Sequence, residues 1–199
     1  VETVAGTAKG LSKIEKDLFD YSFVAVSAYE DLTEAMQKIF NEIGIYFKLC
    51  SICLLTYSKD RRSTKIVLEW KKSQELDNFI KVQEINAEVW SKMEQYCRNH
   101  DMIIVYQNFE IEGIEFSHKF GGKPMVLIPV FDGLDLVYLI SYQKETLDKD
   151  WGSAITDTLS AITKMLASYL LRLNLKKEMK RENLYMEYIM SGQHLFYYV

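Results

Sequence analysis

Two pairs of residues have a spacing that could hold a metal ion: Cys50-x-x-Cys53 and Cys97-x-x-His100. Zinc sites in proteins are commonly assembled from two such pairs. Cys50 and Cys53, however, lie in or beside an apolar run with the character of a strand, where positions three apart point to opposite faces. No glycine between them would turn the chain and bring both sulfurs together. The sequence therefore predicts no metal site, and we interpret the cysteines as small buried hydrophobic residues.

A second candidate for chemistry is the segment FSHKFGGKP at 116–124, which contains His118, two glycines and Lys123. This segment could be a lid whose backbone and imidazole contact a ligand. The alternative is a flexible loop with a histidine on the surface, and both interpretations stay open. The segment lacks the Gly-x4-Gly-Lys-Ser/Thr spacing of a phosphate-binding loop.

Three acidic residues, Glu110, Glu112 and Glu115, precede this segment and could gather a cation. Because they alternate with apolar residues and glycine, we interpret them as a solvated edge. No Ser/His/Asp or paired-carboxylate arrangement stands out elsewhere. We therefore expect these 199 residues to have no catalytic activity of their own.

Aromatic residues are dense around one face of the predicted sheet. They could stack on a planar ligand, or they could simply fill the core, and the sequence leaves both possibilities open. Together with the loop histidine, the candidate pocket residues are Trp70, Tyr106, Phe109, Phe116, His118, Phe131 and Tyr138. The identity of any ligand or cofactor is unknown at this stage.

The elements that would position these residues centre on VLIPVFDGLDLVYLISY, residues 126–142. Two apolar runs joined at Asp132-Gly133 predict a β-hairpin with a tight type I′ turn. Both faces of this hairpin are apolar, whereas a hairpin with one wet face alternates apolar with polar residues. We therefore expect helices 29–47 and 148–173 on one face. Helix 84–99 and loop 108–122 should roof a partly aromatic pocket on the other.

The remaining elements follow from apolar periodicity and turn residues. A helix is predicted at 9–20, strands at 51–58, 65–70 and 102–107, and a loop with a short turn at 108–122. These elements make a mixed α/β domain with an antiparallel sheet of about five to six strands.

The longest predicted element is a helix from about 148 to 183 or beyond, with apolar residues spaced three and four apart. At a rise of 1.5 Å per residue, about 35 residues extend roughly 50 Å, so we expect its far end to project. A projecting helix with an apolar seam usually pairs with a copy of itself. The expected contacts of this homodimer are Leu166, Leu170, Leu173 and Met179.

Composition excludes several classes of function. The net charge of −4 does not favour a nucleic-acid surface. No apolar run reaches the roughly 18–20 residues that cross a bilayer, and the first residues resemble no secretory signal. Three cysteines without disulfide-type spacing favour a reducing compartment. We therefore expect a cytoplasmic protein.

The order of elements, with VLIPV at 126–130, DGLDLVYLISY at 132–142 and LDKDWGSAITDTLSAITKMLASYL at 147–170, resembles the GAF domain, a small-molecule-sensing relative of the PAS fold. The resemblance covers residues 27–173. It implies an N-terminal helical linker at 1–26, a sensor domain at 27–173, and at 174–199 a coiled-coil-type linker leading into a further unit that resembles a PAS domain.

The resemblance implies a sensory module that binds a small molecule and signals through a dimeric helix. The expected receiver is a downstream output domain such as a diguanylate cyclase (GGDEF) or a histidine kinase, as in bacterial signal transduction. Many members have a small residue early in the last strand, where this chain has Val137 and Tyr138. The first alternative is therefore a ligand-free dimerisation spacer. The second is a thiol enzyme that resembles the GAF-fold free-methionine-sulfoxide reductases, with Cys97 as the only candidate nucleophile.

Overall fold

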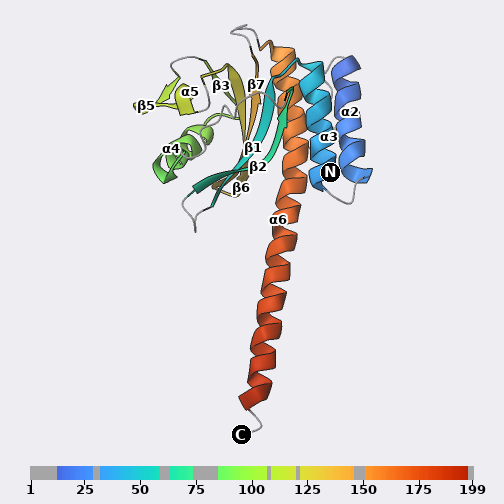
Figure 1. The fold of residues 1–199 in the computed structure, drawn as a ribbon, viewed down its shortest axis with the longest axis vertical. Coiled ribbons are helices and arrows are strands. Elements are labelled where there is room, and N and C mark those ends of the chain that lie inside the picture. The colour runs from blue at the N-terminus through green and yellow to red at the C-terminus, as the bar shows by residue number, and fades with distance from the viewer. Residues whose placement is uncertain are drawn as a thin grey trace.

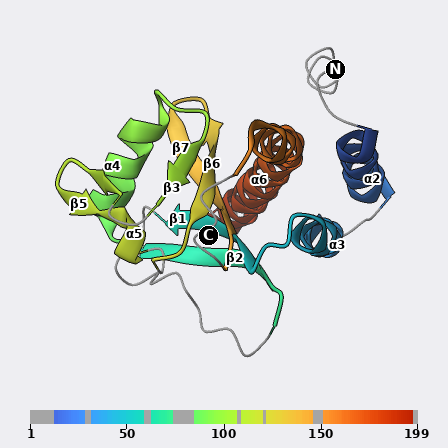
Figure 2. The same cartoon turned by 90° about the horizontal axis from the view of Figure 1, so that it is seen from above.

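The computed structural model describes residues 13–28, 32–58, 63–73, 85–106, 109–119, 122–145 and 151–196. One antiparallel sheet forms the middle layer (Figure 1). On one side of it lie the helices α2 (Lys13–Ala28), α3 (Leu32–Tyr46) and α6 (Ser153–Phe196). On the other side lie α4 (Ala87–Cys97), α5 (Phe116–Lys119) and the short strand β5 (Ile114–Glu115) (Figure 2). The helix prediction for 9–20 corresponds to α2, Lys13–Ala28, and residues 9–12 lie outside the described part.

The sheet has five strands in the order β2-β1-β7-β6-β3, and every described neighbour is antiparallel. The strands are β1 (Ser51–Ser58), β2 (Ser63–Lys71), β3 (Ile103–Val105), β6 (Met125–Asp132) and β7 (Asp135–Gln143). The β1–β2 and β6–β7 hairpins were both expected from the sequence. The predicted antiparallel sheet with flanking helices is therefore confirmed.

The turn of the β6–β7 hairpin differs from the expectation. Asp132 pairs with Asp135, so the two central residues of the turn are Gly133 and Leu134 rather than Asp132 and Gly133. Gly133 has a φ of +60°, and Leu134 is not among the residues with positive φ. A positive φ at the first central position only is typical of a type II′ turn, not of type I′.

A register shift between Val130 and Phe131 changes which residues of β7 share a face. Val130 pairs with Tyr138, but Phe131 pairs with Leu136, so Val137 is an extra residue on β7. Such a bulge reverses the alternation beyond it. Leu136 consequently lies on the α4 side with Leu139, whereas simple alternation had placed it with Tyr138.

The α3 side of the sheet is filled by a first core cluster. Helix α3, Leu32–Tyr46, buries Met36, Ile39 and Phe40 as the apolar periodicity predicted. Helix α6 begins at Ser153 and contributes Leu159 and Ile162 to the same cluster. Helix α2 contacts both α3 and α6. The N-terminal helix therefore packs against the long C-terminal one.

The other side of the sheet is covered by α4, Ala87–Cys97, whose first turn is capped by the side chain of Asn86. Within the segment predicted as a loop, β4 (Glu110–Ile111) and β5 (Ile114–Glu115) form a small hairpin followed by α5 (Phe116–Lys119). Glu112 and Gly113 both have positive φ, which is the signature of a type I′ turn. The loop prediction was therefore wrong for these residues.

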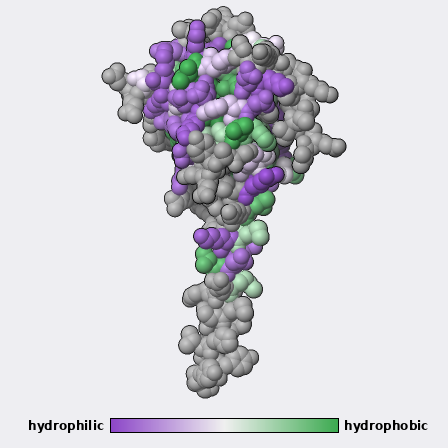
Figure 3. Space-filling view, turned by 90° about the vertical axis from the view of Figure 1, so that its right-hand side faces the viewer, coloured by the Kyte–Doolittle hydropathy of each residue, from purple (hydrophilic) through white to green (hydrophobic). Residues whose placement is uncertain are grey.

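Helix α6 continues without a break from Ser153 to Phe196, a length of 44 residues or about 66 Å. Its first half packs on the sheet, and the rest extends away from the domain (Figure 1). Where its side chains are described, this projecting part carries both hydrophobic and hydrophilic residues (Figure 3). None of the helices that the structure describes is long and apolar enough to cross a membrane.

Candidate functional site

The three cysteines are free and buried. Burial, reinforced by the nearby Glu94 carboxylate, raises the pKa of the Cys97 thiol to about 12. Burial also raises the pKa of Cys50 and of Cys53. Because the thiolate is the nucleophilic form, these environments disfavour thiol chemistry at neutral pH. Among the described residues, no cluster of His, Cys, Asp and Glu side chains could hold a metal ion.

The candidate pocket aromatics do not share one cavity. Trp70 lies on the α3 side, in the first core cluster, and its indole Nε1 donates a hydrogen bond to Asn41 Oδ1 at 3.1 Å. Phe116 is fully buried among the residues under α4, and Phe109 packs against the same group with its ring edge-on to Tyr96. Phe131 packs against this group as well, so the structure brings these three candidate aromatics to the same side of the sheet.

Tyr106 is exposed, so it does not line the interior. The backbone of His118 lies in α5, but its side chain is outside the described part of the structure. The ligand roles expected for all seven residues stay predictions.

Phe131 and Tyr138 line two separate open grooves. A groove of about 490 Å³ follows the outer edge of β6, between the end of α4 and α6, and Phe131 is part of its wall. A second groove of about 370 Å³ lies under α4 beside the stacked rings of Tyr57 and Trp90. Tyr138 borders this groove, but its side chain packs against the first core cluster on the other face of the sheet. Both grooves are open to solvent rather than enclosed.

The first of these grooves exists because β3 pairs with β6 only over residues 125–127. The backbone N–H of Lys144 donates a hydrogen bond to the backbone oxygen of Pro124. This bond determines which residues of β6 are hydrogen bonded to β7. The even-numbered residues of β6 are bonded to β7, so its odd-numbered residues direct their backbone N–H and C=O groups away from β7. Pro129, at the exposed part of the edge, has no N–H to offer, and proline at such a position discourages pairing with another strand.

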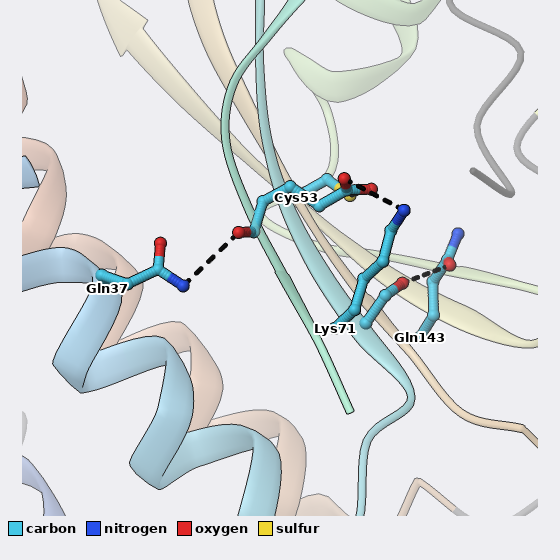
Figure 4. A network of polar contacts seen from close by, with 6 residues as sticks. Gln37, Cys53, Lys71 and Gln143 are labelled. Carbon is cyan, nitrogen blue, oxygen red and sulfur yellow. Dashed lines mark hydrogen bonds and ion pairs between the residues drawn. The ribbon is translucent and has the colours of Figure 1, made fainter. Parts of the chain in front are cut away.

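A buried group of polar side chains lies on the α4 face of the sheet, and the sequence analysis missed it. Alternate residues of three adjacent strands point to this face and pair across it: Ser51 with Lys71 and Gln143, and Cys53 with Glu69 and Ser141. We call Ser51, Cys53, Glu69, Lys71, Ser141 and Gln143 the polar patch. Figure 4 shows part of it, with Cys53, Lys71 and Gln143 labelled.

Hydrogen bonds tie most of the patch together. Ser51 Oγ donates to Gln143 Oε1 at 2.6 Å, and Cys53 Sγ lies 3.5 Å from Glu69 Oε1. Lys71 Nζ is 3.3 Å from Glu69 Oε2, so the two formal charges of the patch neutralise each other. From the opposite side of the sheet, Gln37 of α3 donates to the backbone oxygen of Glu69 (Figure 4).

Ser141 is the exception within the patch. Its residue is fully buried, and its Oγ makes no regular hydrogen bond, although it interacts with the neighbouring Cys53 thiol, a weak acceptor. A buried polar atom without a partner costs about 1–3 kcal/mol, and native structures contain few of them. The hydroxyl therefore marks a position where a bound group would gain a hydrogen bond and displace no more than the weak contact with the Cys53 sulfur.

Comparison with known proteins gives no match at the sequence level. No family model matches this sequence, and no curated protein matches it. Solved structures do match. The GAF domain of a cyanobacterial phytochrome, described with bound phycocyanobilin, aligns with a TM-score of 0.62 at 10% identity, over 83% of this chain and 98% of that one. The chain folds as a GAF domain.

Two further GAF domains align comparably, and both come from phosphoenolpyruvate-protein phosphotransferases. The Acinetobacter domain aligns with a TM-score of 0.59 at 9% identity, over 83% of this chain and 97% of that one. The Coxiella burnetii domain has the same TM-score and identity, over 82% of this chain and 96% of that one. The GAF fold expected from the sequence is confirmed, and identities this low extend the likeness no further than the fold.

Within this fold, β7 connects the polar patch to the long helix. Ser141 and Gln143 face the patch, whereas Tyr142 between them faces the first core cluster. Tyr142 Oη lies 2.7 Å from Thr163 Oγ1 of α6, and both side chains are buried. Burial also raises the pKa of the Tyr142 phenol, which keeps it protonated and able to hydrogen bond.

The four residues predicted to form the dimer contact lie in different environments. Leu166 and Leu170 are buried in the first core cluster of their own chain. The side chain of Leu173 lies outside the described part. Met179 is 63% exposed, beyond the end of the domain. Leu175 and Met186 are exposed on either side of it in the sequence.

Proposed function

We propose that the chain is a sensory module that binds a small molecule over the polar patch and transmits the event through α6. The observation that carries this proposal is the alternation along β7. Ser141 and Gln143 belong to the patch, and the intervening Tyr142 is hydrogen bonded to α6. A single strand thus has buried polar side chains on one face and a contact with the long helix on the other.

The coupling follows from strand geometry. A ligand that displaces Ser141 or Gln143 changes the position of the β7 backbone, and Tyr142 moves with it because successive side chains share one rigid pleat. The core around Tyr142 is closely packed, so α6 must shift with the ring or the hydrogen bond to Thr163 must break. The ligand drives this change only to the extent that it binds one of the two arrangements more tightly.

The receiving part of the mechanism is the projecting half of α6. Leu175, Met179 and Met186 are exposed and recur at steps of four and seven residues, which places them on one helix face. We propose that this face pairs with the same face of a second copy. The expected receiver is an output domain such as a diguanylate cyclase or a histidine kinase.

A thermal-shift screen tests the sensory role. The compounds are purines, cyclic nucleotides, amino acids, organic acids and haem, applied to the wild type and to Ser141→Val, which fills the space at the patch. A ligand at a hundredfold excess over Kd adds about 2.7 kcal/mol of stability, or about 5–10 °C for a domain of this size. The proposal expects a compound that shifts the wild type but not the variant. Equal shifts in both proteins would place binding elsewhere.

The ligand-free dimerisation spacer is the second candidate, and one observation favours it. The side chains under α4 are closely buried, with Phe116 and Leu139 fully inaccessible. A flat screen, with no bound molecule seen by native mass spectrometry, would support this spacer. The thiol enzyme gains no support, because the pKa of every cysteine thiol is raised.

A further inference from the structure

The charge and hydrogen-bonding capacity of the polar patch restrict the molecules that it can accept. The inference that follows rests on the proposed sensory function and concerns the class of its ligand. Ser51, Cys53, Ser141 and Gln143 are each at most 1% exposed, so a molecule in contact with them is removed from water.

The four buried residues Ser51, Cys53, Ser141 and Gln143 form the floor of the patch, and this floor carries no net charge. The two formal charges of the patch belong to Glu69 and Lys71, whose side chains are partly exposed and paired with each other at 3.3 Å. Burial beside Glu69 keeps Cys53 in its neutral thiol form. An anion or a cation placed on the floor would lose its hydration without gaining a counter-ion, which is strongly unfavourable.

The surroundings of the floor are apolar. Leu55, Leu127, Leu139 and Met125 lie on the same face and are fully buried. A few oriented polar groups within an apolar surface are typical of small-molecule sites. The orientation of Gln143 is fixed here, because its Oε1 accepts from Ser51 and its Nε2 is directed towards the sulfur of Met125.

The Ser141 hydroxyl supplies the specific contact. It is buried with no regular hydrogen bond and only a weak acceptor, the Cys53 sulfur, beside it, and it lies two residues from Gln143 on the same face of β7. The two side chains are therefore about 7 Å apart along the strand. A hydroxyl and a primary amide at that spacing suit a molecule with a carbonyl or ring-nitrogen acceptor.

We propose that the polar patch selects an uncharged, planar molecule with a hydrogen-bond acceptor, such as a carboxamide or a neutral heterocycle. Carboxylates, phosphates and amines are excluded. The molecule accepts a hydrogen bond from Ser141, and its ring lies on the apolar residues around the patch. Since the four buried residues of the patch are covered, the molecule can enter only when the groups above them move.

Three probes of nearly identical shape test this selectivity: benzamide is neutral, benzoate is an anion and benzamidinium is a cation. Ligand-observed NMR and thermal shift are recorded with the full chain and each probe at millimolar concentration. The proposal expects benzamide to bind and the two ions to give no signal. In Ser141→Ala, benzamide affinity falls about three- to tenfold, the effect of losing one hydrogen bond. Ser168→Ala, a substitution on α6 outside the patch, leaves the affinity unchanged.

The outcomes separate this inference from the function on which it rests. Binding of benzoate or benzamidinium with loss in Ser141→Ala would overturn the neutral-ligand selectivity and leave the sensory role intact. Benzamide binding that Ser141→Ala does not weaken would overturn the assignment to the patch. Absence of binding by all three probes, with no molecule retained in native mass spectrometry, would overturn both proposals.

Discussion

Tyr142 Oη and Thr163 Oγ1 form a buried hydrogen bond of 2.7 Å between the central strand β7 and helix α6. The two residues are 21 positions apart in the sequence, and each is at most 1% exposed. The bond lies directly behind the polar patch, because Ser141 and Gln143 flank Tyr142 on the opposite face of the strand. It is the contact through which a change at the patch reaches α6 in this account.

Removing one partner of this bond leaves the other buried and unsatisfied. Tyr142→Phe and Thr163→Val should each lower the free energy of unfolding by about 1–3 kcal/mol. The double variant should lose less than the sum, with an interaction energy of about 0.5–3 kcal/mol between contacting residues. Chemical denaturation of the four proteins measures this coupling. Strictly additive losses would show that the two side chains do not interact.

Ser141 and Ser51 provide a matched pair of substitutions within the patch. Ser141→Ala removes a hydroxyl whose contact is the weak one with the Cys53 thiol, so the free energy of unfolding should change by less than about 1 kcal/mol. Ser51→Ala removes the donor to Gln143 Oε1 and should cost about 1–3 kcal/mol. Denaturant titration compares the two. A larger loss for Ser141→Ala than for Ser51→Ala would contradict the assigned hydrogen bonds.

The raised pKa values of the thiols predict how the free energy of unfolding changes with pH. The Cys97 thiol ionises near its ordinary pKa of 9.0 in the unfolded chain, but at about 12 in the folded one. Above pH 9 the unfolded state therefore holds fewer protons, and the free energy of unfolding falls as the pH rises towards 12. Full stability from this thiol is present below pH 9.

Two measurements check this thiol prediction. Denaturation at alkaline pH should show a shallower decline in Cys97→Ala than in the wild type. At neutral pH an aromatic disulfide reagent should modify the native chain slowly and the denatured chain rapidly, because all three thiols are buried. Rapid modification of the native chain would contradict the buried environments and restore the thiol-enzyme alternative.

The proposed dimer depends on the exposed face of α6. Met179→Lys places a charge among Leu175 and Met186 on that face and should convert a dimer to a monomer. Leu184→Lys makes a comparable change on a different face of the helix and should leave the dimer intact. Light scattering at tens of micromolar distinguishes these cases. A wild-type monomer would rule out pairing by this segment.

Much of the fold was readable from the sequence because its signals are local. SICLLTYS at 51–58 is β-branched and apolar between turn residues, and β1 has those bounds. The stripe at Met36, Ile39 and Phe40 identified the buried face of α3. The β4–β5 hairpin was missed because each of its strands has only two residues, too few to show a period.

The polar patch could not be read in the same way, because it depends on strand order and register. Polar residues two apart occur in each of three strands, as Ser51 and Cys53 do in β1. Only the order β2-β1-β7 and its register bring the three pairs together. For the same reason the sequence could not show on which side of the sheet Trp70 lies. That side follows from the pairing of Trp70 with Ile52 and not from the sequence of its own strand.

The central claim is that ligand binding at the patch changes α6, and amide hydrogen exchange along that helix tests it most directly. Exchange is measured with and without the compound that gives the largest thermal shift, in the wild type and in Tyr142→Phe/Thr163→Val. The account predicts altered exchange in β7 and in α6 around Thr163 for the wild type, and a change confined to β7 in the double variant. Binding that leaves α6 exchange unchanged in the wild type would contradict it.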